Sequence, residues 1–423
     1  MDDQEARSVQ FMRSQTGRLI SYQGLVERII EQFNAEYDDN HPSLIEADND
    51  VKRRRLLKPV ADYVFAVESV QLTLEEQAHF LRLVCSELFT YGGLDALFAD
   101  SRVTTISLEG AEKLSVRYAP AEDLQALDPI FEDGQHARRV VARLLRHAGT
   151  DLSAESPFVE AGLLIQGRPV NLNVAVPPYV NQVTADIRVH PTEPIQLIDF
   201  VQAKYMDERS AHFLRALAQS EHGFIIVGDT ESGKTSLLNA LLADVPESGL
   251  AVIERAYTLR LPEAARRYVV QWQAPQKKPV TWAERIQEAV QSGAKTLVLD
   301  EVRADDEDAL APLLSEVCEA RRQIWTFRGS PDPLRLRSAL GMMARIAQRS
   351  APEAAVYALY ERLPFVVVMK RRKTGIHLMA AGEWRWHNGS ADYVPLMEYD
   401  GETARWTSKA PQHALALSAD FWS

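Results

Sequence analysis

The chain has 423 residues, 46% of them hydrophobic and 25% charged, a composition typical of a globular protein with two or three domains. Its net charge of −12 argues against a general nucleic-acid coat protein, because phosphate backbones attract surplus Lys and Arg. The acidic N-terminus lacks the apolar segment of a secretory signal, and no apolar run approaches 18 residues, so we expect a cytoplasmic protein.

Residues 1–90 predict an N-terminal helical extension, in which residues 1–20 are polar and the helical pattern runs from about residue 21 to residue 90. The stretch LVERIIEQF places apolar side chains on one helix face: Leu25, Ile29, Ile30 and Phe33. Thr73, with Glu75 and Glu76 after it, predicts the start of another helix. A basic run at 51–58, VKRRRLLK, and a second one at 369–373 favour a solvated helix face and a strand end or turn over binding patches.

Residues 91–195 predict a small α+β domain. Short strand patterns with Gly and Pro punctuation occur in VTTISLEG, KLSVRYA, FVEAGLLIQGRPVNLNVAVPP and VTADIRVHP. One helix, GQHARRVVARLLRHAG, interrupts them, and Pro191 and Pro194 indicate a linker.

Residues 196–423 alternate apolar strands with helices, which predicts a parallel sheet covered on both faces. In chain order the segments are the strand GFIIVG, the helix GKTSLLNALLADV, the strand GLAVIERA, the helix TWAERIQEAVQSG, the strand KTLVLDEVR, the helix DALAPLLSEVCEARR, the strand QIWTFRG and the helix PLRLRSALGMMARIAQR. A helix at 352–362 and the strands FVVVMKRR, GIHLMAAGEWRW and DYVPLMEYD then predict an antiparallel C-terminal extension. We expect the Trp-rich segments EWRWHNGSADY and ARWTSKAPQHALALSADFWS to cover an edge strand.

The stretch GFIIVGDTESGKTSLLNALL contains a phosphate-loop motif. Gly228, Gly233, Lys234 and Thr235 match G-x-x-x-x-G-K-[ST] between a predicted strand and a predicted helix. Main-chain N–H groups and the helix N-terminus would hold phosphates, with Lys234 on the β/γ-phosphates and Thr235 on Mg²⁺. We therefore expect ATP and Mg²⁺ at these residues: Gly228, Asp229, Thr230, Glu231, Ser232, Gly233, Lys234, Thr235 and Ser236.

Acidic residues end two of the other predicted strands. Asp300 and Glu301 follow the apolar residues of AKTLVLDEVRA, and we expect this strand beside the phosphate-loop strand, with its carboxylates near Mg²⁺ and the attacking water. Solvated acids at a strand end are the alternative interpretation. Glu254, at the end of AVIE, is a second candidate for polarising the water.

These residues resemble the type II/IV secretion-system ATPases, most closely those of Flp/Tad-type pilus assembly. The similarity runs through nearly the whole chain. It includes ELFTYGGLDALFADSRVTTISLEG, SPFVEAGLLIQGRPVNLNVAVPP and VTADIRVHPTEPIQLIDF, whose order and spacing match the family's N-terminal domain and linker. The resemblance implies a RecA-like phosphate-loop core with a smaller α+β N-terminal domain.

The resemblance also implies function and partners. It implies a hexameric ring, or a mixed ring with a paralogue, that acts on an inner-membrane platform protein to secrete proteins or assemble a pilus, with the chain peripheral at the inner membrane. Glu301 matches the Walker B carboxylate, and Glu254 matches the acidic box. Arg188 matches a linker arginine that can approach the nucleotide, and Arg168 a possible phosphate contact.

The chain departs from the family pattern at several polar positions. Arg255 and Thr258 replace two acids of the acidic box Ile-Glu-Asp-x-x-Glu-Leu, Arg328 replaces the histidine of Thr-Ile-His-Ala, Gly162 stands at an arginine position, and Glu231 stands at a glycine of the phosphate loop. If position 231 needs positive φ, its side chain costs about 1 kcal/mol or more.

Three functions therefore remain open. An active motor is favoured by the Lys, the Thr and the carboxylates, with Arg328 as a possible charge stabiliser. A nucleotide-binding structural or regulatory subunit with weak turnover is the alternative, because the loss of one transition-state contact can slow a reaction 10²–10³-fold. A DNA-translocating ATPase is least favoured, because the chain is acidic and lacks an aromatic-basic groove, and no nucleic-acid partner is expected.

Overall fold

The computed structural model describes residues 11–13, 19–37, 41–119, 123–151, 157–193, 195–255, 257–270, 272–273, 278–315, 318–387 and 389–422. The chain divides into two units, residues 1–144 with 180–184 and residues 145–179 with 185–423. Most of the polar N-terminal segment and Pro194 of the predicted linker lie outside the described residues. The domain boundaries predicted at residues 90 and 195 stay a prediction.

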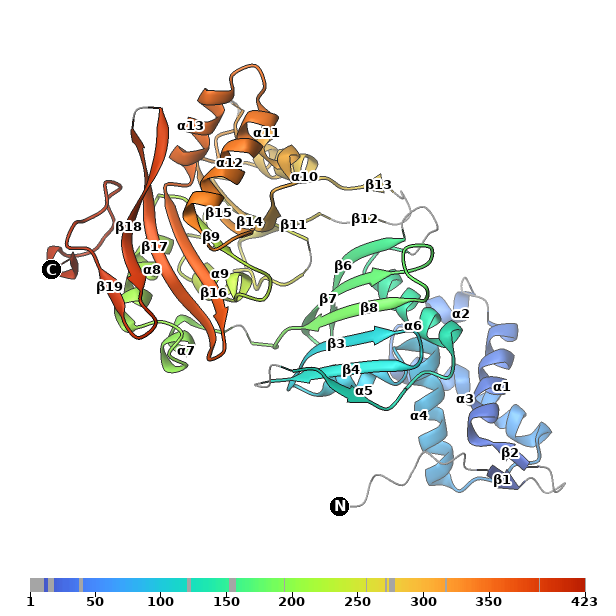
Figure 1. The fold of residues 1–423 in the computed structure, drawn as a ribbon. Helices are drawn as coiled ribbons and strands as arrows, with labels where there is room; N and C mark the ends of the chain where they lie inside the picture. Colours follow the sequence, from blue (N-terminus) through green and yellow to red (C-terminus); the bar gives the residue numbers. More distant parts are fainter. Residues whose placement is uncertain are drawn as a thin grey trace. The chain divides into compact units, whose positions relative to one another are not determined.

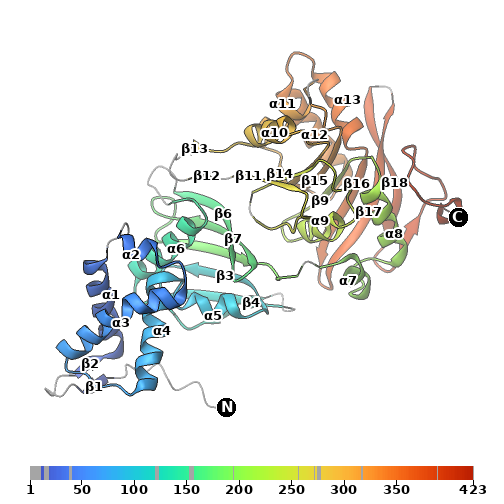
Figure 2. The same ribbon diagram turned by 180° about the vertical axis from the view of Figure 1, so that it is seen from behind.

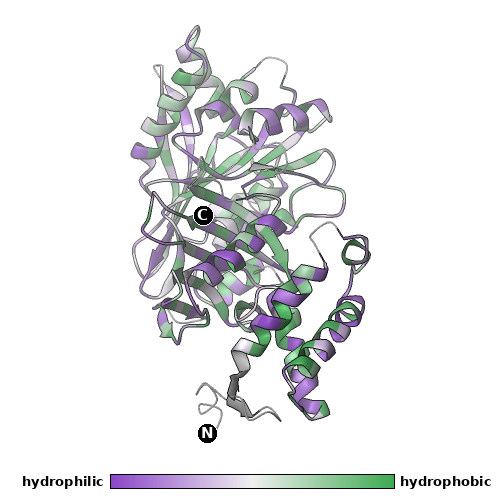
Figure 3. Ribbon diagram, turned by 90° about the vertical axis from the view of Figure 1, so that its right-hand side faces the viewer, coloured by the Kyte–Doolittle hydropathy of each residue, from purple (hydrophilic) through white to green (hydrophobic). Residues whose placement is uncertain are grey.

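The first unit begins with amphipathic helices whose apolar faces pack together. In chain order its elements are β1 (Phe11–Arg13), β2 (Leu19–Ser21), α1 (Tyr22–Glu36), α2 (Pro42–Ile45), α3 (Asp50–Val67), α4 (Leu74–Phe89), α5 (Leu94–Ala99), β3 (Val103–Glu109), β4 (Lys113–Tyr118), β5 (Gln125–Leu127) and most of α6 (Gly134–His147). Leu25, Ile29 and Phe33 of α1 are buried against α3 and α4, as their spacing predicts. Figure 3 shows the corresponding alternation of hydrophilic and hydrophobic residues along these helices.

The predicted helix start at Thr73 is confirmed. The Thr73 hydroxyl accepts from the Glu76 N–H at 3.2 Å, and the Glu76 carboxylate accepts from the Thr73 N–H at 2.7 Å. This reciprocal capping box pairs two N–H groups that the helix itself leaves unpaired. The elements α5 and β5 were not predicted from the sequence.

The second unit opens with the strands β6 (Phe158–Ile165), β7 (Arg168–Ala175) and β8 (Thr184–Val189), neighbours in that order. β6 and β7 form an antiparallel hairpin, and its turn residues Gln166 and Gly167 have φ of +51° and +78°. Two consecutive positive φ angles characterise the turn that best fits the twist of a two-residue hairpin. The strands predicted in this segment are confirmed, and they carry Glu160 and Arg188 toward the site described below.

A large sheet forms the centre of the second unit (Figure 1), with the strand order β11-β10-β14-β15-β9-β16-β17-β18-β19. The strands are β9 (Phe224–Gly228), β10 (Leu250–Glu254), β11 (Arg266–Val269), β14 (Thr296–Arg303), β15 (Arg322–Arg328), β16 (Phe365–Arg372), β17 (Gly375–His387), β18 (Ser390–Tyr399) and β19 (Ala404–Trp406). β12 (Trp272–Gln273) and β13 (Lys278–Pro279) form a separate pair. The strands from β11 to β16 run parallel, whereas β17 to β19 continue the sheet antiparallel.

Helices cover the parallel strands on both faces, as the continuous apolar runs predict (Figures 1 and 2). One face holds α7 (Leu197–Gln202), α8 (Glu208–Gln219) and α9 (Lys234–Leu242); the other holds α10 (Trp282–Gln291), η1 (Glu307–Ala309), α11 (Leu310–Leu313), α12 (Pro333–Ala347) and α13 (Pro352–Arg362). Side chains of β9 alternate between the two cores, with Phe224 and Ile226 in one and Ile225 and Val227 in the other. The predicted α/β class with a RecA-like phosphate-loop core is confirmed.

Three sequence predictions about this sheet need correction. The strand that carries Asp300 is not adjacent to the phosphate-loop strand, because β15 lies between β9 and β14. The strand FVVVMKRR belongs to the parallel core, where β16 pairs with β9, since α13 returns the chain to the same edge of the sheet. The stretch EWRW lies within β17, between β16 and β18, and the edge strand is β19, onto which Phe421 of η2 (Ala419–Trp422) packs through Trp406.

The helix predicted over DALAPLLSEVCEARR is much shorter in the structure. Only η1 and α11 are helical among its described residues. Pro312 supplies no N–H to the helical ladder, and Cys318, Ala320 and Arg322 are buried at every second position, which is the pattern of an extended chain leading into β15. The helices α7 and α8 were also not predicted from the sequence. None of the described helices combines the length and apolar character needed to cross a bilayer.

Candidate functional site

The phosphate loop joins the end of β9 to the start of α9, and two glycines permit its path. A Cβ atom on Gly228 would lie 2.3 Å from the carbonyl oxygen of Met369, and Gly233 has a φ of +87°. Glu231 also has a positive φ, +59°. This confirms that position 231 needs left-handed backbone, at a cost of about 1 kcal/mol or more for a residue with a side chain.

Lys234 is the first residue of α9, and its ammonium group lies inside the loop. Its Nζ atom donates to the carbonyl oxygen of Asp229 at 2.7 Å and to Oγ of Ser232 at 3.4 Å. Burial lowers the pKa of Lys234, while the nearby carboxylates of Glu301 and Asp300 raise it. The loop thus surrounds a buried cation with its own oxygens, and the oxygens of a bound phosphate would offer the same kind of partner.

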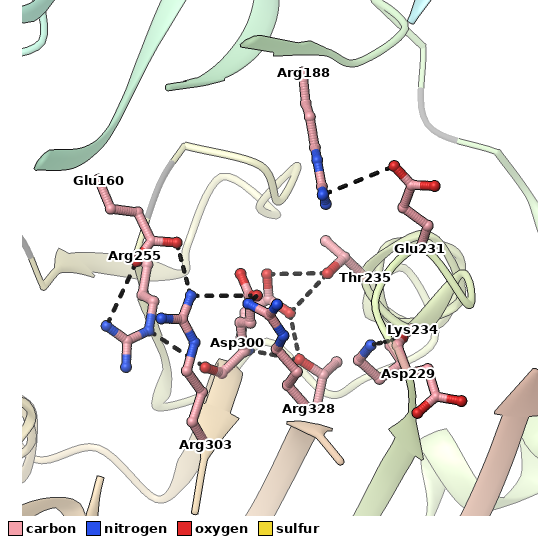
Figure 4. Close-up of polar contacts among 12 residues, drawn as sticks. Glu160, Arg188, Asp229, Glu231, Lys234, Thr235, Arg255, Asp300, Arg303 and Arg328 are labelled. Carbon is pink, nitrogen blue, oxygen red and sulfur yellow. Dashed lines mark hydrogen bonds and ion pairs between the residues drawn. The ribbon is translucent and has the colours of Figure 1, made fainter. Parts of the chain in front are cut away.

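Asp300 lies at the carboxyl end of β14, where threonine hydroxyls surround its carboxylate (Figure 4). Its Oδ1 atom lies 3.1 Å from Oγ1 of Thr235 and 2.6 Å from Oγ1 of Thr326, and its Oδ2 atom lies 3.2 Å from Oγ1 of Thr258. Burial raises the pKa of Asp300, whereas these hydroxyls lower it. Because Mg²⁺ prefers oxygen ligands and retains several waters, Thr235 and Asp300 fit a magnesium site beside the loop.

Glu301 follows Asp300 at an irregularity in the sheet. The register between β14 and β15 shifts between Leu299 and Val302, and Glu301 has a φ of +62°. Consecutive residues of a regular strand point to opposite faces, so a bulge of this kind redirects a side chain. The Glu301 N–H donates to Oγ1 of Thr326 at 2.6 Å, and its partly exposed carboxylate lies 3.5 Å from a guanidinium nitrogen of Arg328.

A network of arginines and carboxylates continues from Glu301 (Figure 4). Nη2 of Arg303 lies 3.4 Å from Glu301 and 2.7 Å from Oε1 of Glu160 on β6. Arg255 donates to both carboxylate oxygens of Asp306 at 2.5 and 2.6 Å, and another of its nitrogens lies 4.0 Å from Glu160. Two arginines thus link the end of β14 to β6.

Comparison with known proteins identifies the family of this chain. The model described as "Type II/IV secretion system protein" matches residues 101–312, half of the chain. The chain belongs to this family. A putative conjugal transfer protein of Mycobacterium tuberculosis is 25% identical over 331 residues, covering 74% of this chain and 93% of its own length. The probable conjugal transfer protein TrbB of Sinorhizobium fredii is 29% identical over 160 residues, covering 37% of this chain and 47% of its own.

Solved structures with similarity to the chain include two ATPases. The VirB11 ATPase of the Brucella suis type IV secretion system, crystallised with sulphate, is 19% identical with a TM-score of 0.34, covering 69% of this chain and 96% of its own. The Legionella pneumophila ATPase DotB is 13% identical with a TM-score of 0.47, covering 73% of this chain and 80% of its own. The predicted closeness to Flp/Tad-type members within the family stays a prediction.

The structure brings most of the predicted site residues together. Thr235 contacts Asp300, the Lys234 ammonium is near enough for the Asp300 and Glu301 carboxylates to affect its pKa, and Glu301 forms an ion pair with Arg328. Nη2 of Arg188, on β8, lies 3.7 Å from the Glu231 carboxylate. Of the remaining loop residues, Asp229 and Thr230 are exposed, whereas Ser232 is fully buried. The roles assigned to all these residues stay predictions.

Glu254, at the end of β10, is fully buried and has no access to solvent. Its Oε2 atom accepts from the N–H groups of Thr258 and Leu259 at 2.8 and 3.0 Å, and Oε1 lies 3.2 Å from Nη1 of Arg267. Burial raises its pKa to about 7, although Arg267 acts in the opposite direction. This carboxylate closes the turn after β10, so its predicted part in polarising water would require the turn to open.

Two further positions singled out from the sequence lie on the β6–β7 hairpin. Arg168, at the start of β7, is buried and donates from Nε to the carbonyl oxygen of His190 at 3.0 Å. Gly162 lies within β6 opposite Asn171, on the same face of the strand as Glu160. A phosphate contact from Arg168 stays a prediction.

Four charged residues of the site were not predicted from the sequence: Glu160, Arg303 and Asp306 of the network, and Arg267, which pairs with Glu254. The sequence contains a usable signal for one of them, Asp306. An arginine at position 255, in a segment where the family has an acid, needs a carboxylate partner when half-buried, and Asp306 follows β14 at the same edge of the sheet. Glu160 comes from a distant strand, and no local pattern indicates it.

Proposed function

We propose that this chain is an ATP-binding motor subunit that hydrolyses ATP to drive protein secretion or pilus assembly at the inner membrane. The observation that carries the proposal is the contact between Thr235 and Asp300 directly beside the buried ammonium of Lys234. A phosphate-binding lysine, a hydroxyl and a strand-end carboxylate in contact are the parts that phosphoryl transfer from Mg²⁺-ATP requires. Family membership supports the same function.

The side chains suggest a division of labour during hydrolysis. Lys234 and the loop N–H groups would hold the phosphates, while Thr235 and Asp300 would hold Mg²⁺, which neutralises charge that develops on the phosphate oxygens. Glu301, redirected by the bulge, is the carboxylate placed to accept a proton from water. Arg188 and Arg328 are the guanidinium groups able to turn toward the developing charge.

The ring and its partners belong to the same proposal. We infer a homo-oligomeric ring of six copies, or a mixed ring with a paralogue, that acts on an inner-membrane platform protein from the cytoplasmic side. The support is the resemblance of the chain to the family and its membership in it.

The test measures phosphate release at saturating Mg²⁺-ATP by the full chain and by Lys234→Ala. We expect the variant to lose about 10²-fold in rate, because it lacks a group that contacts the transferred phosphate. Lys295→Ala, which removes an exposed lysine of the same unit, is the matched control and should retain the wild-type rate.

A second function, a nucleotide-binding subunit with weak turnover, is favoured by one observation. Glu301 is ion-paired with two guanidinium groups, 3.4 Å from Arg303 and 3.5 Å from Arg328, so its carboxylate would have to leave these partners to reach an attacking water. If the wild-type chain binds nucleotide but releases phosphate no faster than Lys234→Ala, this second function replaces the motor. Failure of the wild-type chain to bind nucleotide would reject both.

A further inference from the structure

Glu231 is the residue of the phosphate loop that fits its position least well. Its backbone has a φ of +59°, where glycine is unstrained, and its carboxylate adds negative charge where a triphosphate would bind. Its backbone is nevertheless fixed, because Nε of Arg371 on β16 donates to its carbonyl oxygen at 3.0 Å. The proposed hydrolysis gives the Glu231 side chain no role.

The Glu231 side chain has an oppositely charged partner from a distant strand. Nη2 of Arg188 lies 3.7 Å from its Oε1 atom, and both side chains are about 30% exposed. Figure 4 shows Arg188 extended from β8 toward the loop, with Glu231 directed at its guanidinium group. Nε of Arg188 is buried without a hydrogen-bond partner among the described residues, and it lies 3.9 Å from Asp186. Ion pairing at these distances holds the guanidinium group near the loop without binding it through short hydrogen bonds.

We propose that Glu231 is a positioning residue that holds Arg188 at the mouth of the phosphate loop until a nucleotide arrives. The Glu231 carboxylate pairs with the Arg188 guanidinium group in the way that a phosphate would, and a bound triphosphate takes the place of the carboxylate. This inference rests on the proposed nucleotide binding, and it adds that the Glu231 carboxylate competes with the phosphates for Arg188. A partly exposed ion pair changes an equilibrium by up to about fivefold, which a charged, bidentate phosphate contact readily exceeds.

The competition has a consequence for nucleotide affinity. In the wild-type chain, the favourable free energy of the contact between Arg188 and the phosphates is partly offset by the free energy needed to separate Arg188 from Glu231. Removal of the Glu231 charge should therefore strengthen binding, and part of that gain should depend on Arg188. Removal of any other loop carboxylate should give only the smaller gain that comes from reduced repulsion of the phosphates.

The experiment is a double-mutant cycle on equilibrium binding of Mg²⁺ with a non-hydrolysable ATP analogue. The variants are Glu231→Gln, Arg188→Gln and the double variant, with Asp229→Asn as the matched removal of an exposed carboxylate from the same loop. We expect Glu231→Gln to bind about fivefold more tightly than wild type, and Arg188→Gln to bind more weakly. In the Arg188→Gln background, Glu231→Gln should add no more than Asp229→Asn does.

Two results would overturn the inference. An equal gain from Glu231→Gln in both backgrounds would show that the carboxylate only repels phosphate, and no gain would show that it does not compete. Glu231→Gly, which removes the carboxylate and the unfavourable φ together, should reproduce the gain and guards against a folding defect of the first variant. Because wild-type binding is measured in the same series, its absence would reject the proposed function as well, whereas binding without coupling rejects only the role of Glu231.

Discussion

Three charged residues that depart from the family pattern each lie beside an opposite charge. Arg255 pairs with Asp306, Arg328 lies 3.5 Å from Glu301, and Glu231 lies 3.7 Å from Arg188. A half-buried charge without a partner would destabilise the fold. At the scale of single residues, the altered positions therefore form a rearranged charge network, which favours a retained function for the site over its decay.

Glu254 gives a prediction about stability and pH. Its pKa is raised by burial to about 7, so the folded chain binds a proton there more tightly than the unfolded chain, in which a glutamate has a pKa near 4.5. The stabilisation from this proton is complete below pH 4.5 and is lost as pH rises through about 7. By the usual conversion it amounts to roughly 3 kcal/mol.

Glu254→Gln resembles the protonated acid and should therefore remove this pH dependence. We expect the free energy of urea unfolding to fall less steeply between pH 5 and about pH 8 in the variant than in the wild-type chain. Tryptophan fluorescence can follow the unfolding of the second unit. Glu263→Gln, which alters an exposed carboxylate nearby, should keep the wild-type profile. Parallel profiles for Glu254→Gln and wild type would show that the carboxylate titrates normally.

At the scale of secondary-structure elements, the site depends on an irregularity between β14 and β15. The bulge at Glu301 interrupts the ladder, and the Thr326 hydroxyl replaces the lost contacts by accepting from the Glu301 N–H and donating to Asp300, both at 2.6 Å. One hydroxyl of β15 thus fixes two consecutive carboxylate residues of β14. Without it, the backbone that directs Glu301 would lose its buried partner.

Thr326→Val keeps the side-chain shape and removes this hydroxyl. It leaves the Glu301 N–H unpaired, so we expect a loss of about 1–3 kcal/mol in stability, together with weaker Mg²⁺-ATP binding because Asp300 shifts. Thermal unfolding and nucleotide titration measure the two effects. Thr326→Ser restores a hydroxyl and should recover most of both losses. If Thr326→Val unfolds and binds like wild type, the hydroxyl does not support the bulge.

The elements that sequence analysis predicted correctly carry their signal locally. The β9–loop–α9 unit follows from glycine spacing and apolar periodicity, and the α4 start follows from Thr73 and Glu76. The errors arose where the pairing of strands far apart in the sequence determines the structure. Nothing local shows that β15 separates β9 from β14, or that Glu160 of β6 binds Arg303, because such contacts depend on how distant strands pack.

At the scale of the whole molecule, charge limits the choice of partners. The net charge is −12, and the basic run on α3 is partly neutralised, because Lys52 and Lys58 lie 2.9 and 3.4 Å from Asp48 and Asp62. The second basic run ends β16, where the sequence predicted a strand end, and its Arg371 contacts the phosphate loop. Arg53 of the first run and Arg372 of the second lie over the rings of Phe89 and Tyr399, 5.5 and 5.8 Å from the ring centroids, so these aromatic faces are paired within the chain.

We therefore predict that the full chain does not bind duplex DNA. Fluorescence anisotropy of a labelled duplex of about 30 base pairs should stay flat up to about 10 µM protein, even at low salt, where nonspecific binding through phosphates is strongest. Titrations with and without Mg²⁺-ATP test whether nucleotide changes the result. An anisotropy rise that disappears as salt increases would contradict the prediction and revive a DNA-translocating function. Arg54→Glu together with Arg55→Glu, which reverses two exposed charges of α3, would then show whether that helix carries the binding.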